Sequence, residues 1–551
     1  MGDDQYYQVN DNQQYYNTEY NTTDEIENWA DSEEGIDLYF VIFLTMLAVA
    51  LTCSKFLHDS PRIAAILPEA GMIIIIGAIF GAILFFAFLP LSNGEVVEDD
   101  DGENDHINEF VAEGLLSFSP KVFFFVLLPP IIFNSGYTLK REVFFRHIAP
   151  ISFFACAGTA ISTFVIATFL EILKIFGLFG DFKPKFTELI TFGALISATD
   201  PVSTLAVFQA KKVDPQLFYL VFGESVLNDA VGLVLFKTTS KLVGNEDSVE
   251  RVFDVVVDFL VDFSFGFVGS MIMGFAAGLA IALFLKKVDM RNTPLLELSL
   301  YFLIMYLPFF AAELFGLSGI VTILFTGISA RRYATHNLSE ATEETADQLF
   351  RLVAHLAETA IFLEVGLCVV LFVQNFQSNW RFAAFAMVAC LIGRALNVYP
   401  LRMVYNQSLH RKDHKDHFDE SFDVDALQAA ASDNSPRINI AQSTLSMAET
   451  LTPATRRDLK IRDNTAHMLW FSGLRGAVAY SCAKEFPNAF GNRSAFVFTT
   501  MFIVLFTVFI FGCSTELALN TLKIETNVDE AKYMDENETM DKMDYITLIG
   551  K

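Results

Sequence analysis

The chain has 551 residues, of which 53% are hydrophobic and 57 are phenylalanine, and its mean hydropathy is +0.40. Apolar residues come in blocks of about twenty, which is more apolar surface than one soluble core can bury and is typical of a helical membrane protein with many spans. The formal charge of −27 and the lack of a basic patch with interleaved aromatic residues argue against a nucleic-acid partner.

Acidic runs without lysine or arginine occupy 1–37 and 98–105. Such runs are typical of solvated tails and loops. The six cysteines are scattered without CxxC spacing, so we expect neither disulfides nor a zinc site, and no cofactor. His410, His414 and His417 are expected to belong to a solvated charged loop. No basic region precedes the first apolar block, which we expect to act as its own insertion signal.

The apolar windows predict about thirteen membrane-spanning helices. They lie at 38–56, 63–91, 117–134, 147–176, 187–209, 216–240, 253–286, 294–314, 317–331, 348–375, 380–404, 464–485 and 492–518. Basic residues gather in alternate short loops, so the positive-inside rule places the amino terminus in the lumen or outside and the carboxyl terminus in the cytosol. This topology puts the glycosylation sequons at Asn21 and Asn492 on the external side.

Two spans contain residues that interrupt a membrane helix. The fifth reads "GALISATDPVSTLAVF", where Pro201 removes a backbone donor and disfavours helical geometry at Asp200. The twelfth reads "FSGLRGAVAYS", where Gly473 and Gly476 bracket Arg475. If spans 1–6 and 8–13 are inverted repeats, the two interruptions correspond and indicate a transport site at the bilayer midplane.

Proline kinks and glycine contacts are also common in ordinary membrane helices, but a charge at each interruption favours a site. Where two broken helices cross, their half-helix amino termini carry partial positive charge and their carboxyl termini partial negative charge. Asp200 can neutralise the former and Arg475 the latter. Carbonyl groups released near Thr199 are candidate cation ligands.

The sixth span places acidic residues in an otherwise apolar stretch, "FGESVLNDAVGLVLF" at 222–236. Ser225 and Asp229 share a helix face and offer oxygen ligands for Na⁺ or K⁺. Glu224 and Asn228 share the neighbouring face and need a buried cationic partner, for which Arg394 of span eleven is the candidate. A Glu224–Arg394 ion pair would leave Asp229 as the exchangeable carboxylate.

Four other acidic residues lie within or at the ends of apolar blocks: Glu69, Glu313, Glu358 and Glu364. They either line the entrance to an ion pathway or are structural groups whose hydrogen bonds are satisfied, and the sequence leaves both interpretations open.

The interrupted spans and the acidic stretch of the sixth span resemble those of the eukaryotic sodium/proton exchangers of the monovalent cation/proton antiporter superfamily, most nearly the organellar branch. The resemblance covers about 40–404 and 464–520. It is carried by "FFFVLLPPIIFNSGY", "SATDPVSTLAVF", "VDPQLFYLVFGESVLNDAV", "GRALNVYP" and "SGLRGAVAYS". It implies an all-α antiporter fold with inverted repeats and two unwound crossing helices, in which a core domain of spans 4–6 and 11–13 moves against a dimerisation domain of a homodimer.

The resemblance also implies roles for individual residues. The Asn228-Asp229 pair marks the electroneutral branch, with Asp229 as the ion carrier, and Asp200 helps to hold the ion. We therefore predict Asp229, Asn228, Ser225, Asp200 and Thr199 as the ion-binding residues. The Glu of "GES", Glu224, pairs with the Arg of "GRA", Arg394. The segment after the last span is short and 405–463 is long for a connecting loop, so regulation by partner proteins does not carry over.

We therefore predict a division of the chain into alternating domains. It comprises an acidic lumenal tail (1–37), dimerisation spans 1–3 (38–140), core spans 4–6 (141–245), spans 7–10 (246–376), core span 11 (377–404), a flexible cytosolic loop (405–463), core spans 12 and 13 (464–520) and a short cytosolic tail (521–551).

The predicted function is transport within a lipid bilayer rather than enzyme catalysis. Na⁺ or K⁺ would exchange one for one with H⁺ at Asp229, in an endosomal, Golgi or vacuolar membrane. A plasma-membrane Na⁺/H⁺ exchanger is the alternative. A cation channel should show a continuous polar stripe or a repeated carbonyl filter, and an intramembrane aspartyl protease a "GxGD" context, and the sequence has none of these.

Overall fold

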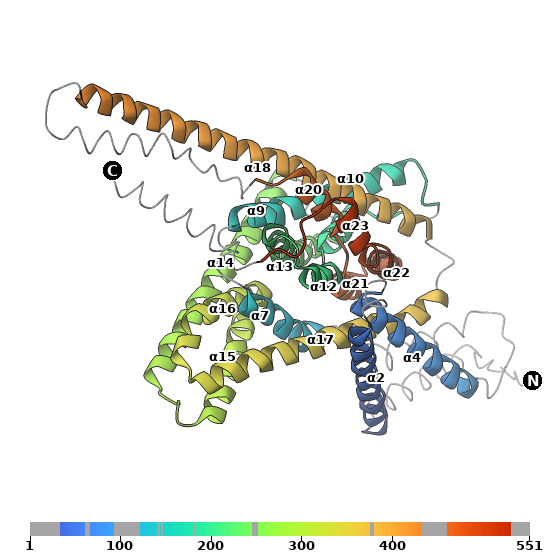
Figure 1. Cartoon of the computed structure of the whole chain (residues 1–551). Helices are drawn as coiled ribbons and strands as arrows, with labels where there is room; N and C mark the ends of the chain where they lie inside the picture. The colour runs from blue at the N-terminus through green and yellow to red at the C-terminus, as the bar shows by residue number, and fades with distance from the viewer. Residues whose placement is uncertain are drawn as a thin grey trace, which may run out of the picture.

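The computed structural model describes residues 33–60, 67–92, 122–139, 144, 147–180, 182–244, 252–374, 380–431 and 460–529. Within these ranges the regular structure is helical, without a β-strand (Figure 1). The predicted all-α membrane class is thus confirmed. The acidic runs at 1–32 and 98–105, the sequon at Asn21 and the side chains of His410, His414 and His417 lie outside the described part of the chain.

One group of helices packs around α17, and we refer to it as the scaffold. It comprises α2 (Glu33–Asp59), α4 (Glu69–Ser92), α7 (Leu128–Thr138), α14 (Val252–Lys287), α15 (Pro294–Leu314), α16 (Gly319–Tyr333) and α17 (Glu340–Gln374). Glycines allow α4 and α17 to approach closely, because a Cβ atom on Gly77 would lie 2.4 Å from the carbonyl oxygen of Leu363. Small residues at helix contacts are the usual means of close packing in membranes.

A second group of helices lies near the centre of the molecule (Figure 1), and we refer to it as the core. It surrounds two pairs of short helices, α11–α12 and α20–α21. It comprises α9 (Ile148–Phe153), α10 (Thr159–Ile175), α11 (Phe186–Ser197), α12 (Val202–Lys211), α13 (Pro215–Ser240), α18 (Trp380–Ala431), α20 (Asp463–Phe471), α21 (Ala477–Lys484), α22 (Arg493–Phe506) and α23 (Thr515–Thr521). These helices fall within the residues assigned above to the core spans, and the division into a core domain that moves against a dimerisation domain remains a prediction.

Nine helical stretches of the described residues are long and apolar enough to cross a membrane. They are Phe40–Leu57, Ile148–Ile175, Phe186–Lys211, Pro215–Ser240, Phe263–Lys287, Pro294–Leu314, Glu340–Val369, Trp380–Leu409 and Arg493–Gly512. Two shorter apolar helices, Glu69–Leu84 and Phe123–Thr138, α16 and the α20–α21 pair fall in the remaining predicted windows. The total of thirteen spans stays a prediction.

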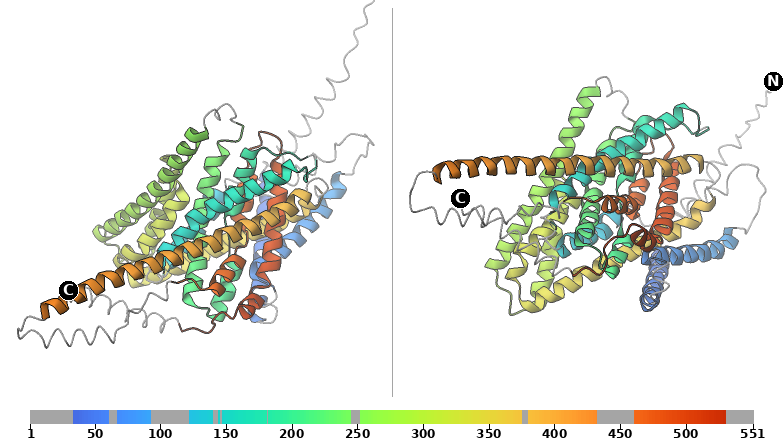
Figure 2. Two further views of the ribbon diagram at one scale, coloured as in Figure 1. Left: turned by 90° about the horizontal axis from the view of Figure 1, so that it is seen from above. Right: turned by 45° about the horizontal axis from the view of Figure 1, so that its top comes forward.

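Helix α18 continues well past the other helices, to Ala431 (Figure 2). The structure differs here from the sequence prediction of a loop that starts at 405. Residues 405–431 contain no proline or glycine, the residues that disfavour a helix most strongly, so the helix can continue.

The side chain of Asn492, the acceptor residue of a predicted glycosylation sequon, makes a structural contact. The Asn492 side-chain nitrogen, the atom that would carry a sugar, donates hydrogen bonds of 3.1 and 3.0 Å to the two carboxylate oxygens of Glu188. Glu188 lies at the start of α11 and is fully buried. Glycosylation of Asn492 would replace one of the two amide hydrogens and so weaken this contact with a buried carboxylate.

Candidate functional site

The centre of the core is a crossing of two unwound segments. Helix α11 ends at Ser197 and α12 begins at Val202, while α20 ends at Phe471 and α21 begins at Ala477. The two connections touch, since the Asp200 backbone nitrogen donates a 2.9 Å hydrogen bond to the carbonyl oxygen of Leu474. Two helix carboxyl termini and two helix amino termini therefore meet at one place.

Asp200 lies between the two amino termini. Its Oδ1 accepts a 3.2 Å hydrogen bond from the backbone nitrogen of Val202, the first residue of α12. Gly476, which immediately precedes α21, packs against the same carboxylate, and a Cβ atom there would lie 2.0 Å from Asp200 Oδ2. Only glycine leaves room for the side chain of Asp200, whose negative charge is stabilised by the partial positive charge of the helix ends.

The two carboxyl termini each receive a guanidinium group. Arg475 Nη1 donates hydrogen bonds of 3.2 Å to the carbonyl oxygens of Ser197 and Ala198, at the end of α11. Arg394 Nη2 donates a 2.9 Å bond to the carbonyl oxygen of Leu469, near the end of α20. The sequence reasoning anticipated the first contact and missed the second, because it assigned Arg394 to Glu224 alone.

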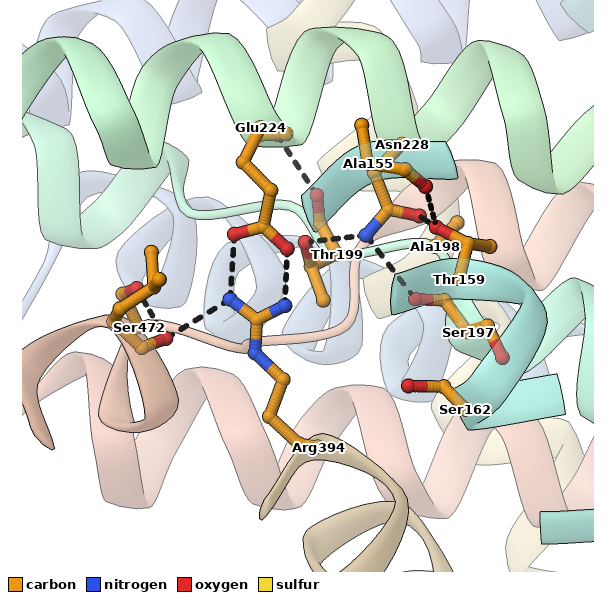
Figure 3. A network of polar contacts seen from close by, with 12 residues as sticks. Ala155, Thr159, Ser162, Ser197, Ala198, Thr199, Glu224, Asn228, Arg394 and Ser472 are labelled. Carbon is orange, nitrogen blue, oxygen red and sulfur yellow. Dashed lines mark hydrogen bonds and ion pairs between the residues drawn. The ribbon is translucent and has the colours of Figure 1, made fainter. Parts of the chain in front are cut away.

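Glu224 and Arg394 face each other and form a buried ion pair (Figure 3). Arg394 Nη2 donates a 2.7 Å hydrogen bond to Glu224 Oε2, and Nη1 donates to Oε1. The residues are only 1% and 3% exposed. Both carboxylate oxygens of Glu224 are thus engaged, and two forked hydrogen bonds fix α13 to α18.

Asn228 ties α13 to the unwound segment and to α10 (Figure 3). Its side-chain nitrogen donates to Thr199 Oγ1 at 3.2 Å and to the Ser197 carbonyl oxygen at 3.4 Å, and its Oδ1 accepts a 2.7 Å bond from Thr159. Ser225 Oγ donates a 2.8 Å bond to the Thr199 carbonyl oxygen. The expectation that Asn228 shares the cationic partner of Glu224 is therefore wrong.

Thr159 is a member of this network that the sequence reasoning missed. It is fully buried on α10, and it anchors the Asn228 amide oxygen. The available signal was the presence of several hydroxyl side chains in an apolar span, "GTAIST", but hydroxyl groups in membrane helices usually bond to their own backbone.

Asp229 is the carboxylate of α13 without an assigned partner: its Oδ1 is buried and has no hydrogen-bond partner among the residues that the structure describes. It follows Asn228 on α13, one helical turn after Ser225. An unpaired buried carboxylate oxygen is costly and calls for an explanation.

Three of the four remaining acidic residues have structural partners. Glu364 pairs with Lys484 at 2.5 Å, Glu313 pairs with Lys237 at 3.2 Å, and Glu69 accepts a hydrogen bond from Ser54. Glu358 lies half-buried on α17. The structural interpretation thus fits these first three, while a role in an ion pathway stays a prediction.

Comparison with known proteins gives a consistent assignment. Residues 44–521 match the family model described as "Sodium/hydrogen exchanger, transmembrane". The chain is 34% identical over 487 residues to human "Sodium/hydrogen exchanger 8", covering 88% of this chain and 72% of the relative. It is 34% identical over 530 residues to rat "Sodium/hydrogen exchanger 9", covering 89% and 72% of the two chains.

A solved structure shares the fold. The sodium proton antiporter MjNhaP1 from Methanocaldococcus jannaschii aligns with a TM-score of 0.56 over 88% of this chain and 99% of that chain, at 14% identity. The chain is accordingly an integral membrane transporter rather than an enzyme. Since the family model spans both interrupted helices and the buried carboxylates of α13, the chain belongs to the sodium/hydrogen exchanger family of cation/proton antiporters.

Proposed function

We propose that the protein exchanges Na⁺ or K⁺ for H⁺, one for one, at the carboxylate of Asp229. The observation that carries this proposal is the buried Asp229 Oδ1, which lacks a hydrogen-bond partner among the described residues while the neighbouring charged groups are engaged. A bare carboxylate is costly to move through an apolar barrier, whereas a bound proton or a monovalent cation cancels its charge. Only the loaded site can then cross, which couples the two fluxes.

The charges around Asp229 support an electroneutral exchange. Glu224 is balanced by Arg394, Asp200 by the helix amino termini, and Arg475 by the carboxyl terminus of α11. Among the five charged side chains Glu224, Arg394, Asp200, Arg475 and Asp229, that of Asp229 is the one without a compensating group, so one monovalent cation or one proton neutralises it. Exchange of one for the other moves no net charge.

The oxygen atoms near Asp229 suit an alkali cation. Ser225 Oγ and the Thr199 carbonyl oxygen lie 2.8 Å apart and keep lone pairs beyond the hydrogen bond between them. Asp200 adds a second carboxylate at the crossing, and Asn228 positions the Thr199 segment. We propose that Asp229, Ser225, Thr199 and Asp200 contribute cation ligands, and that Asn228 acts by positioning them. Hydroxyl, carbonyl and carboxylate oxygens accept both Na⁺ and K⁺, so the residue types do not select between these ions.

The experiment is cation-driven proton flux in proteoliposomes, measured with a lumenal pH dye for Na⁺, K⁺ and Li⁺. Asp229→Asn should abolish the flux, while the matched control Glu171→Gln, on the partly exposed end of α10, should keep it. Exchange by Asp229→Asn at the wild-type rate would refute the assignment. A turnover rate that depends on an imposed membrane potential would contradict electroneutrality.

We further propose that the protein acts in an organelle membrane as a homodimer, with its amino terminus in the lumen, and there sets pH and cation content. The resemblance to the organellar branch and the positive-inside pattern support this placement. Imaging of a fluorescent carboxyl-terminal fusion against endosomal and Golgi markers tests it, and fluorescence confined to the plasma membrane would favour the alternative of a plasma-membrane exchanger.

A further inference from the structure

Two lysine–glutamate pairs join the core to the scaffold. Lys484, the last residue of α21, lies 2.5 Å from Glu364 of α17. Lys237, in the last turn of α13, lies 3.2 Å from Glu313 of α15. In both pairs the lysine belongs to the core and the glutamate to the scaffold.

The pairs lie on one side of the ion site. Lys237 is eight residues beyond Asp229, and Lys484 is nine beyond Arg475, so each is about 12 Å along the helix axis from the crossing. Helices α13 and α21 both run from the cytosol toward the lumen in the predicted topology. Both lysines therefore lie on the lumenal side of the site.

Several other ion pairs of the described residues stay within one helix group. On the opposite side of the site, Lys211 of α12 pairs with Glu516 of α23 at 2.6 Å, and Arg462 pairs with Glu525 at 3.1 Å, and these are all core residues. In the scaffold, Arg331 of α16 lies 3.7 Å from Glu343 of α17. Pairs of this kind do not change when the two groups move relative to each other.

We propose that Lys484–Glu364 and Lys237–Glu313 form a lumenal latch, which closes the lumenal access to Asp229 and must open in each transport cycle. The proposal rests on the proposed function, since it assumes that the core moves against the scaffold. A lysine ammonium is a compact charge on a flexible chain, so it can leave its partner more easily than a forked arginine can.

The two pairs contribute unequally to the latch. Glu364 and Lys484 have only 5% and 15% exposed side chains, and the Lys484 ammonium also lies 4.9 Å from the centre of the Tyr480 ring. Lys237 and Glu313 are 49% and 28% exposed, and water and salt screen their attraction. The Lys484–Glu364 pair is the main element of the latch, and Lys237–Glu313 is its outer element.

Reversible cross-linking tests the latch directly. In a background without native cysteines, Glu364→Cys/Lys484→Cys is bridged with a short bis-methanethiosulfonate reagent and assayed in proteoliposomes before and after reduction. Bridging should lower the exchange rate at least about tenfold, and reduction should restore it. The matched control Lys211→Cys/Glu516→Cys links two core elements and should change the rate less than about twofold. A bridged 364/484 protein that exchanges at its reduced rate would overturn the proposal.

A second measurement does not depend on transport. With Cys482 as the sole cysteine, a membrane-impermeant maleimide added from the lumenal side should label Glu364→Gln/Lys484→Met at least about threefold faster than the unaltered pair. Cys482 is buried two residues before Lys484, so it reports opening of this helix end. Equal labelling rates would contradict the latch. Absence of exchange in every reduced protein would instead count against the proposed function, while the labelling result would still stand.

Discussion

Removal of one partner from the Glu224–Arg394 pair should destabilise the protein strongly. In Arg394→Met, the Glu224 carboxylate stays 1% exposed but loses both guanidinium bonds, and the Leu469 carbonyl oxygen loses one of its donors and keeps Ser472 Oγ. An uncompensated buried charge of this kind costs about 3–5 kcal/mol. At roughly 1 °C per kcal/mol for a chain of this length, the apparent unfolding midpoint in detergent should fall by about 3–5 °C.

The double variant separates charge from packing. Glu224→Gln/Arg394→Met removes both charges, so it should recover most of the lost stability, because a neutral pair of similar volume avoids the desolvation cost. Arg351→Met serves as control, since Arg351 is 62% exposed where it pairs with Asp347 at 3.0 Å, and its loss should cost less than about 1 kcal/mol. If Arg394→Met melts like the control, or the double variant melts as low as the single one, the pair does not act as described.

Three further outcomes follow from the site and from the amino-terminal end of α13. Gly476→Ala should reduce proton flux severalfold with little loss of folded protein, because the Cβ atom of the new alanine must displace the Asp200 side chain. A flux at the wild-type rate would show that the position of the Asp200 side chain is unimportant for exchange. Thr159→Val should cost about 1–3 kcal/mol, since the fully buried Asn228 loses a donor, whereas Thr159→Ser should melt like wild type. Asp214 caps α13 outside the membrane span, and burial raises the pKa of its carboxyl group. The nearby Glu525 carboxylate raises this pKa further, whereas the hydrogen bond from the Gln216 backbone nitrogen and the charge of Arg462 lower it. Because the native pKa lies above the unfolded one, wild type should lose stability relative to Asp214→Asn as the pH rises from about 3.5 to 7, and a relative gain would contradict the shift.

The crossing could be predicted from sequence because its signals are local. Asp200-Pro201 stops a helix by backbone chemistry, and glycines beside Arg475 do the same in the other half, so the position of each break is encoded within a few residues. The partner of Glu224 could also be predicted from the sequence. A lone arginine in an apolar span must meet an acid, and few acids were available.

Contacts that depend on the packing of distant spans could not be predicted. Thr159 resembles many other hydroxyl residues of membrane helices until α10 is placed against Asn228. In the sequence, Lys484 is an ordinary charged residue at the end of a helix. Its pairing with Glu364 depends on the placement of α17 against α21. The extension of α18 was missed because a polar composition suggests a loop, although polar residues without glycine or proline also suit a helix that leaves the membrane.

The position of the Arg475 guanidinium group gives a reason why the cation and proton fluxes should be coupled. If its guanidinium paired with Asp229, the empty site would be neutral and could cross without a cation or a proton, which would uncouple the exchange. Arg475 Nη1 is instead held by the carbonyl oxygens of Ser197 and Ala198, at a helix end that attracts positive charge. The break in span five thus supplies possible cation ligands near Thr199 and also restrains the arginine from neutralising the carrier. In the proposed exchange, unwinding two helices at one place would therefore serve coupling as well as binding.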